Sequence, residues 1–143
     1  MVRVAQLGIA IGLLGVVISV MGLFPGLTGL EPTQGIGIAQ IFAILTGFTL
    51  LIFGALVYVK FTFYPHTHSN LLQQIGTRLA MTGLVIAALA GMADVLGFGS
   101  HGNDPDTIIF LGPWQAIAIL LNFLVSALGV LIYAIGGETE GEE

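Results

Sequence analysis

Four long apolar stretches constrain the fold of this 143-residue chain more than any other feature. They run from Val4 to Phe24, Ile36 to Val59, Leu79 to Phe98 and Ile108 to Ile135. At a rise of about 1.5 Å per residue, a helix of each length crosses the roughly 30 Å hydrocarbon core of a bilayer. Apolar residues make up 56% of the chain and charged residues 8%, and the mean hydropathy is +1.02, which excludes an ordinary soluble domain. The sequence predicts an all-α membrane protein whose four transmembrane helices form a single domain over residues 1–143.

The second half of the chain resembles the first half at two fixed offsets. The pairs at an offset of 68 residues include Gln6 and Gln74, Gly8 and Gly76, and Gly15 and Gly83. The pairs at an offset of 75 include Gln40 and Gln115, Gly54 and Gly129, and Tyr58 and Tyr133. This pattern predicts two tandemly duplicated helical hairpins, one over about 4–59 and one over about 72–135. Because each copy has an even number of spans, we expect a parallel 2+2 repeat about an axis along the membrane normal.

The few cations predict the orientation of the chain. With four spans, Arg3, Lys60 and Arg78 all fall on one side, and the loops on the other side contain no Lys or Arg. Lys and Arg are retained on the cytoplasmic side during insertion. We therefore expect a multi-pass protein of the cytoplasmic membrane with both termini in the cytoplasm, and residues 136–143 as an acidic cytoplasmic tail.

Small residues recur at spacings of three and four in the first and third spans. In the first span they are Gly8, Gly12, Gly15, Ser19 and Gly22, and in the third they are Gly76, Ala80, Gly83 and Ala87. At this spacing the residues share one helix face, and small faces allow helix backbones to approach closely in lipid. We expect the two faces to meet, which makes the first and third helices the central pair. The alternative is that one face binds an outside partner.

Polar residues within the spans are the candidates for a bound cofactor. Asn122 stands where the first copy has Gly47, so its amide either forms an interhelical hydrogen bond or donates to the carbonyl of a bound quinone, pigment or lipid. Gln40 and Gln115 are further candidates at the outer side. Asp94 is the acid within an apolar stretch, and we favour a role at the helix end over proton transfer.

Two loops contain possible metal ligands. His101, Asp104 and Asp106 lie in the second outer loop, and His66 and His68 form a His-x-His pair on the cytoplasmic side. Histidine and carboxylate side chains ligate transition metals and hard cations. Their spacing matches no known metal motif, so a solvated loop is the favoured interpretation and no metal is expected.

The chain shows no set of residues typical of catalysis. It has no cysteine, no His-Glu-x-x-His motif and no basic patch for nucleic acid. We therefore expect that the protein is not an enzyme.

We expect a non-catalytic accessory subunit of a larger membrane complex, of the respiratory or photosynthetic electron-transfer type. Its expected partners are other integral membrane subunits and lipids. We expect no intrinsic cofactor, although a lipid, quinone or pigment could bind. The alternative is a small transporter or channel for a small solute, with Gln40, Asp94, Gln115 and Asn122 as its polar contacts.

Overall fold

The computed structural model describes residues 2–29, 36–93, 96–97 and 111–137. The described chain is all-helical, with α1 at Val2–Leu23, α2 at Ile38–Phe63, α3 at Leu71–Gly91 and α4 at Pro113–Ile135. A short 3-10 helix, η1, covers Pro25–Thr28. All four α-helices are long and apolar enough to cross a membrane. The predicted fold class, a membrane protein of four spanning helices, is confirmed.

The helix boundaries follow from local chemistry. Pro25 lies just beyond the end of α1, and Pro113 begins α4, where its missing N–H is not needed. α3 begins at Leu71, well before the apolar stretch that predicted it, because the Asn70 side chain caps the helix by accepting from the Gln73 backbone N–H at 2.9 Å. The cap allows polar residues to form the first two turns of a spanning helix.

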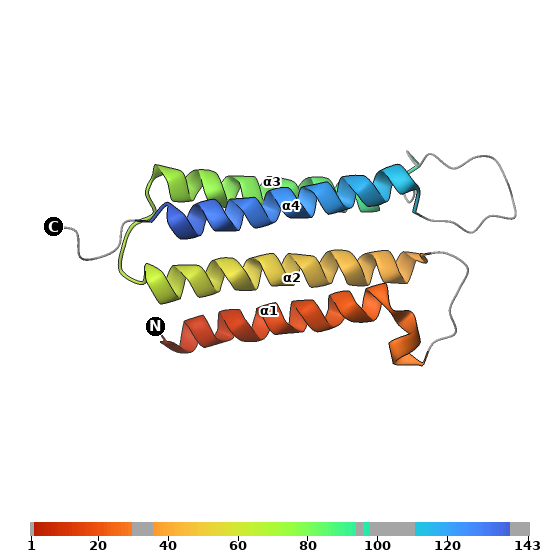
Figure 1. Cartoon of the computed structure of the whole chain (residues 1–143), viewed down its shortest axis with the longest axis horizontal. Helices are drawn as coiled ribbons and strands as arrows, with labels where there is room; N and C mark the ends of the chain where they lie inside the picture. The colour runs from red at the N-terminus through yellow and green to blue at the C-terminus, as the bar shows by residue number, and fades with distance from the viewer. Residues whose placement is uncertain (1, 30–35, 94–95, 98–110, 138–143) are drawn as a thin grey trace, which may run out of the picture.

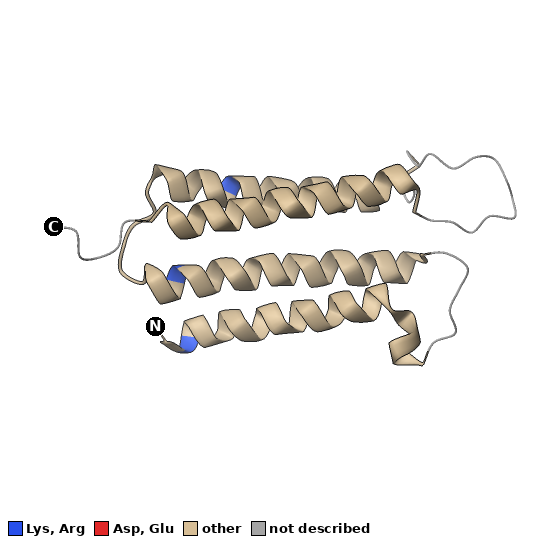
Figure 2. Cartoon of the chain, viewed as in Figure 1, with Lys and Arg blue, Asp and Glu red and all other residues tan. Residues whose placement is uncertain are grey.

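The helices form two antiparallel hairpins that lie side by side, α1 with α2 and α3 with α4 (Figure 1). Both described chain ends lie at one end of the molecule, together with the connection between α2 and α3 (Figure 1). We name this the terminal end, and the opposite end the loop end. Arg3, Lys60 and Arg78 all lie in the half of the molecule nearer the terminal end (Figure 2).

Backbone contacts hold α1 against α2. A Cβ atom built on Gly8 would lie 2.7 Å from the backbone nitrogen of Tyr58, and one on Gly15 would lie 2.5 Å from the carbonyl oxygen of Gly47. From the other side, a Cβ on Gly54 would lie 2.5 Å from the nitrogen of Gly12. Backbone atoms cannot move aside as a side chain can. The two helices therefore touch backbone to backbone at Gly8, Gly15 and Gly54, where no side chain fits.

The contact between α3 and α4 has the same design. A Cβ on Gly76 would lie 2.7 Å from the nitrogen of Tyr133, and one on Gly129 would lie 2.5 Å from the nitrogen of Ala80. A Cβ on Gly83 would lie 2.6 Å from the carbonyl oxygen of Asn122. These contacts occupy positions related to those of the first hairpin by the offsets of 68 and 75 residues.

The expectation that α1 and α3 form the central pair is wrong. Each small-residue face packs within its own hairpin, because the following helix supplies complementary glycines. Between the hairpins, α2 is the helix of the first hairpin that contacts both α3 and α4. Apolar side chains pack against one another between the hairpins. This core consists of Ile41, Leu45 and Ile52 from α2, Ala80, Leu84 and Ala87 from α3, and Ile119 and Phe123 from α4.

Candidate functional site

Gln40 and Gln115 serve as helix caps. Each accepts a hydrogen bond through its side-chain oxygen from the backbone N–H three residues earlier, Gly37 at 2.8 Å and Gly112 at 2.7 Å. The Gln40 amide nitrogen also donates to the Gly22 carbonyl at 3.2 Å, which joins the end of α1 to the start of α2. Both glutamines therefore satisfy backbone groups that a helix end leaves without partners.

Asn122 is half-buried on the side of α4 that contacts α3. Its side-chain nitrogen donates to the carbonyl of Ala118 at 2.8 Å, one turn earlier in the same helix. The interhelical hydrogen bond expected of Asn122 is made instead by Ser126, whose hydroxyl donates to the Ala80 carbonyl of α3 at 2.9 Å. Sequence reasoning missed Ser126, although this position also departs from the first copy, which has Leu51 there.

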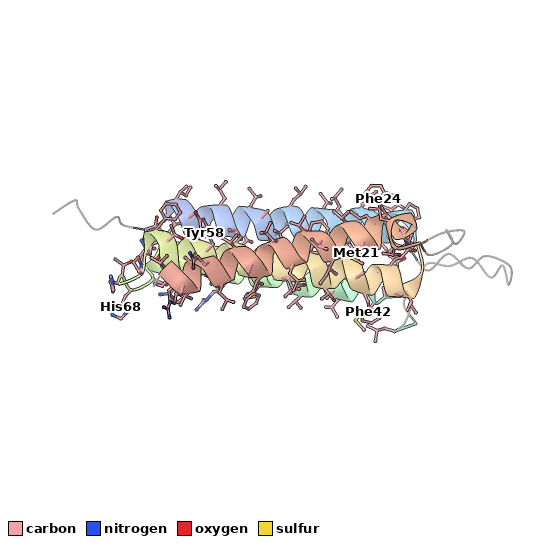
Figure 3. All side chains as sticks on the ribbon, turned by 90° about the horizontal axis from the view of Figure 1, so that it is seen from below. Met21, Phe24, Phe42, Tyr58 and His68 are labelled. Carbon is pink, nitrogen blue, oxygen red and sulfur yellow. The ribbon has the colours of Figure 1, made fainter. Side chains whose placement is uncertain are left out.

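The predicted metal ligands are not brought together by the described structure. His66 and His68 are exposed on the connection between α2 and α3, and Figure 3 shows His68 at the terminal end. Asp94, His101, Asp104 and Asp106 lie outside the described residues. Among the described residues there is no group of three or more His, Cys, Asp or Glu that could hold a metal ion.

A polar cluster ties the two hairpins together at the terminal end. The Tyr64 hydroxyl donates to the Ala134 carbonyl at 2.6 Å, and the Asn70 side-chain nitrogen donates to the Gly136 carbonyl. These bonds satisfy carbonyls at the C-terminal end of α4. Gln73 is 1% exposed, and its side-chain nitrogen has no hydrogen-bond partner among the described residues. The cluster is a structural tie between the α2–α3 connection and α4.

An apolar groove of about 290 Å³ lies between the hairpins in the half nearer the loop end. Its lining includes Ile41, Leu45 and Phe48 from α2, and Ala116, Ile119 and Phe123 from α4. Leu23 at the end of α1 and Leu111 before α4 complete the wall. The rings of Phe48 and Phe123 stack with centroids 4.1 Å apart, toward the middle of the molecule.

Among the described residues, no polar side chain lines this groove. Its surface can bind an apolar chain by contact alone, and it offers no group for acid–base chemistry or metal ligation. The sequence gives no signal for it, because its leucine, isoleucine and phenylalanine residues are those found throughout the spans. It is the candidate site of this protein.

Comparison of the chain with protein-family models, with curated proteins and with solved structures found no match.

Proposed function

We propose that this protein is a non-catalytic accessory subunit of a larger integral membrane complex. The observation that carries the proposal is the apolar core between the hairpins, formed by apolar side chains of α2, α3 and α4. A chain that moved a solute between its own hairpins would need polar groups along that path, and the core residues supply none.

The distribution of exposed side chains supports the same proposal. Large apolar residues are exposed along all four helices, including Leu13 at 61%, Val85 at 59% and Leu120 at 59%. In a bilayer these surfaces contact either lipid or the spans of other subunits. The described chain has no soluble domain that could carry an activity of its own. Its contribution would be to fill space and order neighbours within the membrane.

The alternative function is a small transporter or channel. The polar side chains that would line its path have other roles in the structure, since Gln40 and Gln115 cap helices and Asn122 bonds to its own helix. Asn122→Leu separates the two proposals. A transporter would lose flux in this variant, whereas an accessory subunit would assemble with its partners as the wild type does, because no bond between helices is lost.

We also propose that the two hairpins are duplicated copies with the terminal end in the cytoplasm. The equivalent backbone contacts at Gly8 and Gly76 and at Gly54 and Gly129 support the duplication. The positions of Arg3, Lys60 and Arg78 support the orientation, since all three lie nearer the terminal end (Figure 2). Labelling of single cysteines introduced at His68 and at Leu27 would test it, because the chain has no cysteine of its own. A membrane-impermeant reagent added to whole cells should label Leu27→Cys alone.

The test of the accessory role is purification of the C-terminally tagged chain from native membranes in mild detergent. Native gels and mass spectrometry would then show stoichiometric larger subunits. The host that we propose is a respiratory or photosynthetic electron-transfer assembly, and haem or pigment bands in the visible spectrum of the purified material would support that choice. A colourless particle that contains this chain alone would contradict the proposal.

A further inference from the structure

The accessory-subunit role does not explain the groove between the hairpins. It is bounded by α2 and α4, and its lining residues Ile41, Leu45, Ile119 and Phe123 also belong to the core between the hairpins. The groove is therefore continuous with an interface inside the molecule. We propose that it holds one acyl chain of a membrane phospholipid, from the leaflet at the loop end.

The length of the groove matches one leaflet. Its wall on α4 runs from Leu111, just before the helix, to Phe123, and its wall on α2 runs from Ile36, also just before the helix, to Phe48. At a rise of about 1.5 Å per residue, these segments measure roughly 15–18 Å. Half of a hydrocarbon core of about 30 Å is the depth that the chains of one leaflet occupy. The stacked rings of Phe48 and Phe123 lie at the deep end of both walls.

The volume of the groove selects a single chain over a helix of a partner protein. A helix with its side chains is about 10–12 Å wide, so a helical segment as long as the groove would occupy on the order of 1,000 Å³. All the empty space within the groove, including the part open to its surroundings, comes to about 750 Å³. A partner helix could lie across the mouth of the groove but could not fill it.

The chemistry of the lining selects a phospholipid over a quinone. A quinone head group needs hydrogen-bond donors for its carbonyls, since polar groups buried without partners are costly. Among the described residues, neither Gln40 nor Gln115 lines the groove. Their side-chain oxygens cap their own helices, and the Gln40 nitrogen donates to the Gly22 carbonyl. An acyl chain needs only dispersion contacts with apolar walls, and Leu23, Ile119 and Leu120 provide such contacts.

An acyl chain in this position would bridge the two hairpins. It would contact α2 on one wall and α4 on the other, so it would act as an additional element of the interface between them. In its absence the walls would have no contact partner across the groove, which weakens packing between the hairpins. The bound lipid would therefore stabilise the association of the hairpins without changing either hairpin.

The first experiment counts phospholipids bound to the purified chain by native mass spectrometry, in wild type and in Ala116→Trp. Ala116 is exposed and lines the groove, so an indole there fills its mouth without replacing a core residue. Ala127→Trp is the matched control, since Ala127 is an exposed alanine of the same helix away from the groove. We expect one phospholipid to persist in the wild type and in Ala127→Trp, and to be lost in Ala116→Trp. Equal retention in both variants would overturn the proposal.

The second experiment reports on the groove without filling it. In a Trp114→Phe background, Phe48→Trp places the chain's single indole at the deep end of the groove, and Phe53→Trp places it on the exposed surface of α2. Each variant is titrated in detergent with phosphatidylcholine brominated near the ends of its acyl chains. We expect quenching of the Phe48→Trp variant to saturate near one equivalent, and the Phe53→Trp variant to require a large excess. Identical titrations would contradict the proposal.

The occupant itself is identified by organic extraction of the purified chain and mass spectrometry. Stoichiometric phospholipid is the expected result, and stoichiometric prenyl quinone without phospholipid would overturn it. All these measurements use the isolated chain. A negative result would overturn the lipid proposal but not the accessory-subunit role, which is tested by the purification of partner subunits. A positive result would not establish that role.

Discussion

The interfaces within the hairpins and the interface between them are built on different principles. Within each hairpin, glycines bring backbone against backbone, as at Gly15 and Gly47 in the first and at Gly76 and Gly129 in the second. Between the hairpins, large side chains such as Phe123 separate the helix axes and meet one another. The first kind of contact leaves no space, and the second leaves the apolar groove.

This difference predicts where the molecule tolerates change. A backbone contact cannot adapt to an added methyl group, because the atoms it would meet belong to another helix and are fixed by that helix's hydrogen bonds. A side-chain contact can adapt through rotamers or through a guest molecule. We therefore regard the hairpins as the rigid units of this protein, and the interface between them as its adjustable part.

The largest expected effect is that of Gly54→Ala. The added Cβ would lie 2.5 Å from the nitrogen of Gly12 and 2.6 Å from the carbonyl oxygen of Gly8, so α1 must move away from α2. We expect a loss of about 3 kcal/mol in the free energy of unfolding, the upper end of the usual range for overpacking. Gly12→Ala is the control, since its Cβ would meet nothing closer than Leu51 at 4.0 Å. Unfolding in mixed micelles with increasing dodecyl sulfate, followed by circular dichroism, measures both. Equal losses would refute the backbone-contact model.

Phe123→Ala should have the next largest effect, and it should act between the hairpins. The ring is 6% exposed and stacks on Phe48. In lipid, the variant is destabilised only by the lost contacts and by the cavity that the ring leaves. We expect a loss of about 1–2 kcal/mol in the free energy of unfolding. Energy transfer between dyes placed on α1 and α3 should show that the hairpins separate. Leu124→Ala, at a residue 55% exposed, should change little. Separation of α1 from α2 in the Phe123 variant would contradict the assignment of Phe123 to the interface between the hairpins.

Tyr64→Phe tests the polar tie at the terminal end. It removes the 2.6 Å hydrogen bond from the Tyr64 hydroxyl to the Ala134 carbonyl, which should cost about 1 kcal/mol. The described structure shows a ring contact with Phe63 but no hydrogen bond for Tyr58, so Tyr58→Phe is the matched control. Hydrogen exchange at the end of α4 should rise in the first variant alone. Unchanged exchange there would show that the tie does not hold the end of α4.

Ser126→Ala should have the smallest effect. Its hydroxyl donates across the second hairpin to the Ala80 carbonyl, and such bonds in membrane proteins average about 0.6 kcal/mol. Ser19 occupies a similar place in the first hairpin, but its hydroxyl donates to Gly15 of its own helix at 2.8 Å. Ser19→Ala should therefore be close to neutral in the same micelle assay. A larger loss at Ser19 than at Ser126 would reverse our assignment of the interhelical bond.

The two predicted stripes of small residues illustrate the limits of sequence reasoning. Their periodicity indicates correctly that Gly8 and Gly83 lie on contact faces, because helical spacing alone places such residues together. It does not indicate which helix each face meets. Glycines on α2 and α4 decide that, and they are sparse, since α2 has Gly47 and Gly54 and α4 has Gly129 alone.

The candidate polar residues show the same limit. Asn122, Gln40 and Gln115 stand out in an apolar sequence, yet Asn122 donates to a backbone carbonyl one turn earlier, and the side-chain oxygens of the two glutamines accept from backbone N–H groups three residues earlier. Any helix end or helix interior can provide such partners, so composition cannot distinguish a cap from a ligand.

The sequence by itself determined that the chain crosses a membrane in four helices, because hydropathy and length act on each span separately. It also determined that small residues form contact faces. Only the tertiary structure decided that each face closes its own hairpin, that Ser126 rather than Asn122 bonds between helices, and that an apolar groove remains between α2 and α4. These features depend on which surfaces meet, and in lipid many apolar surfaces can meet with similar energy until backbone contacts select among them.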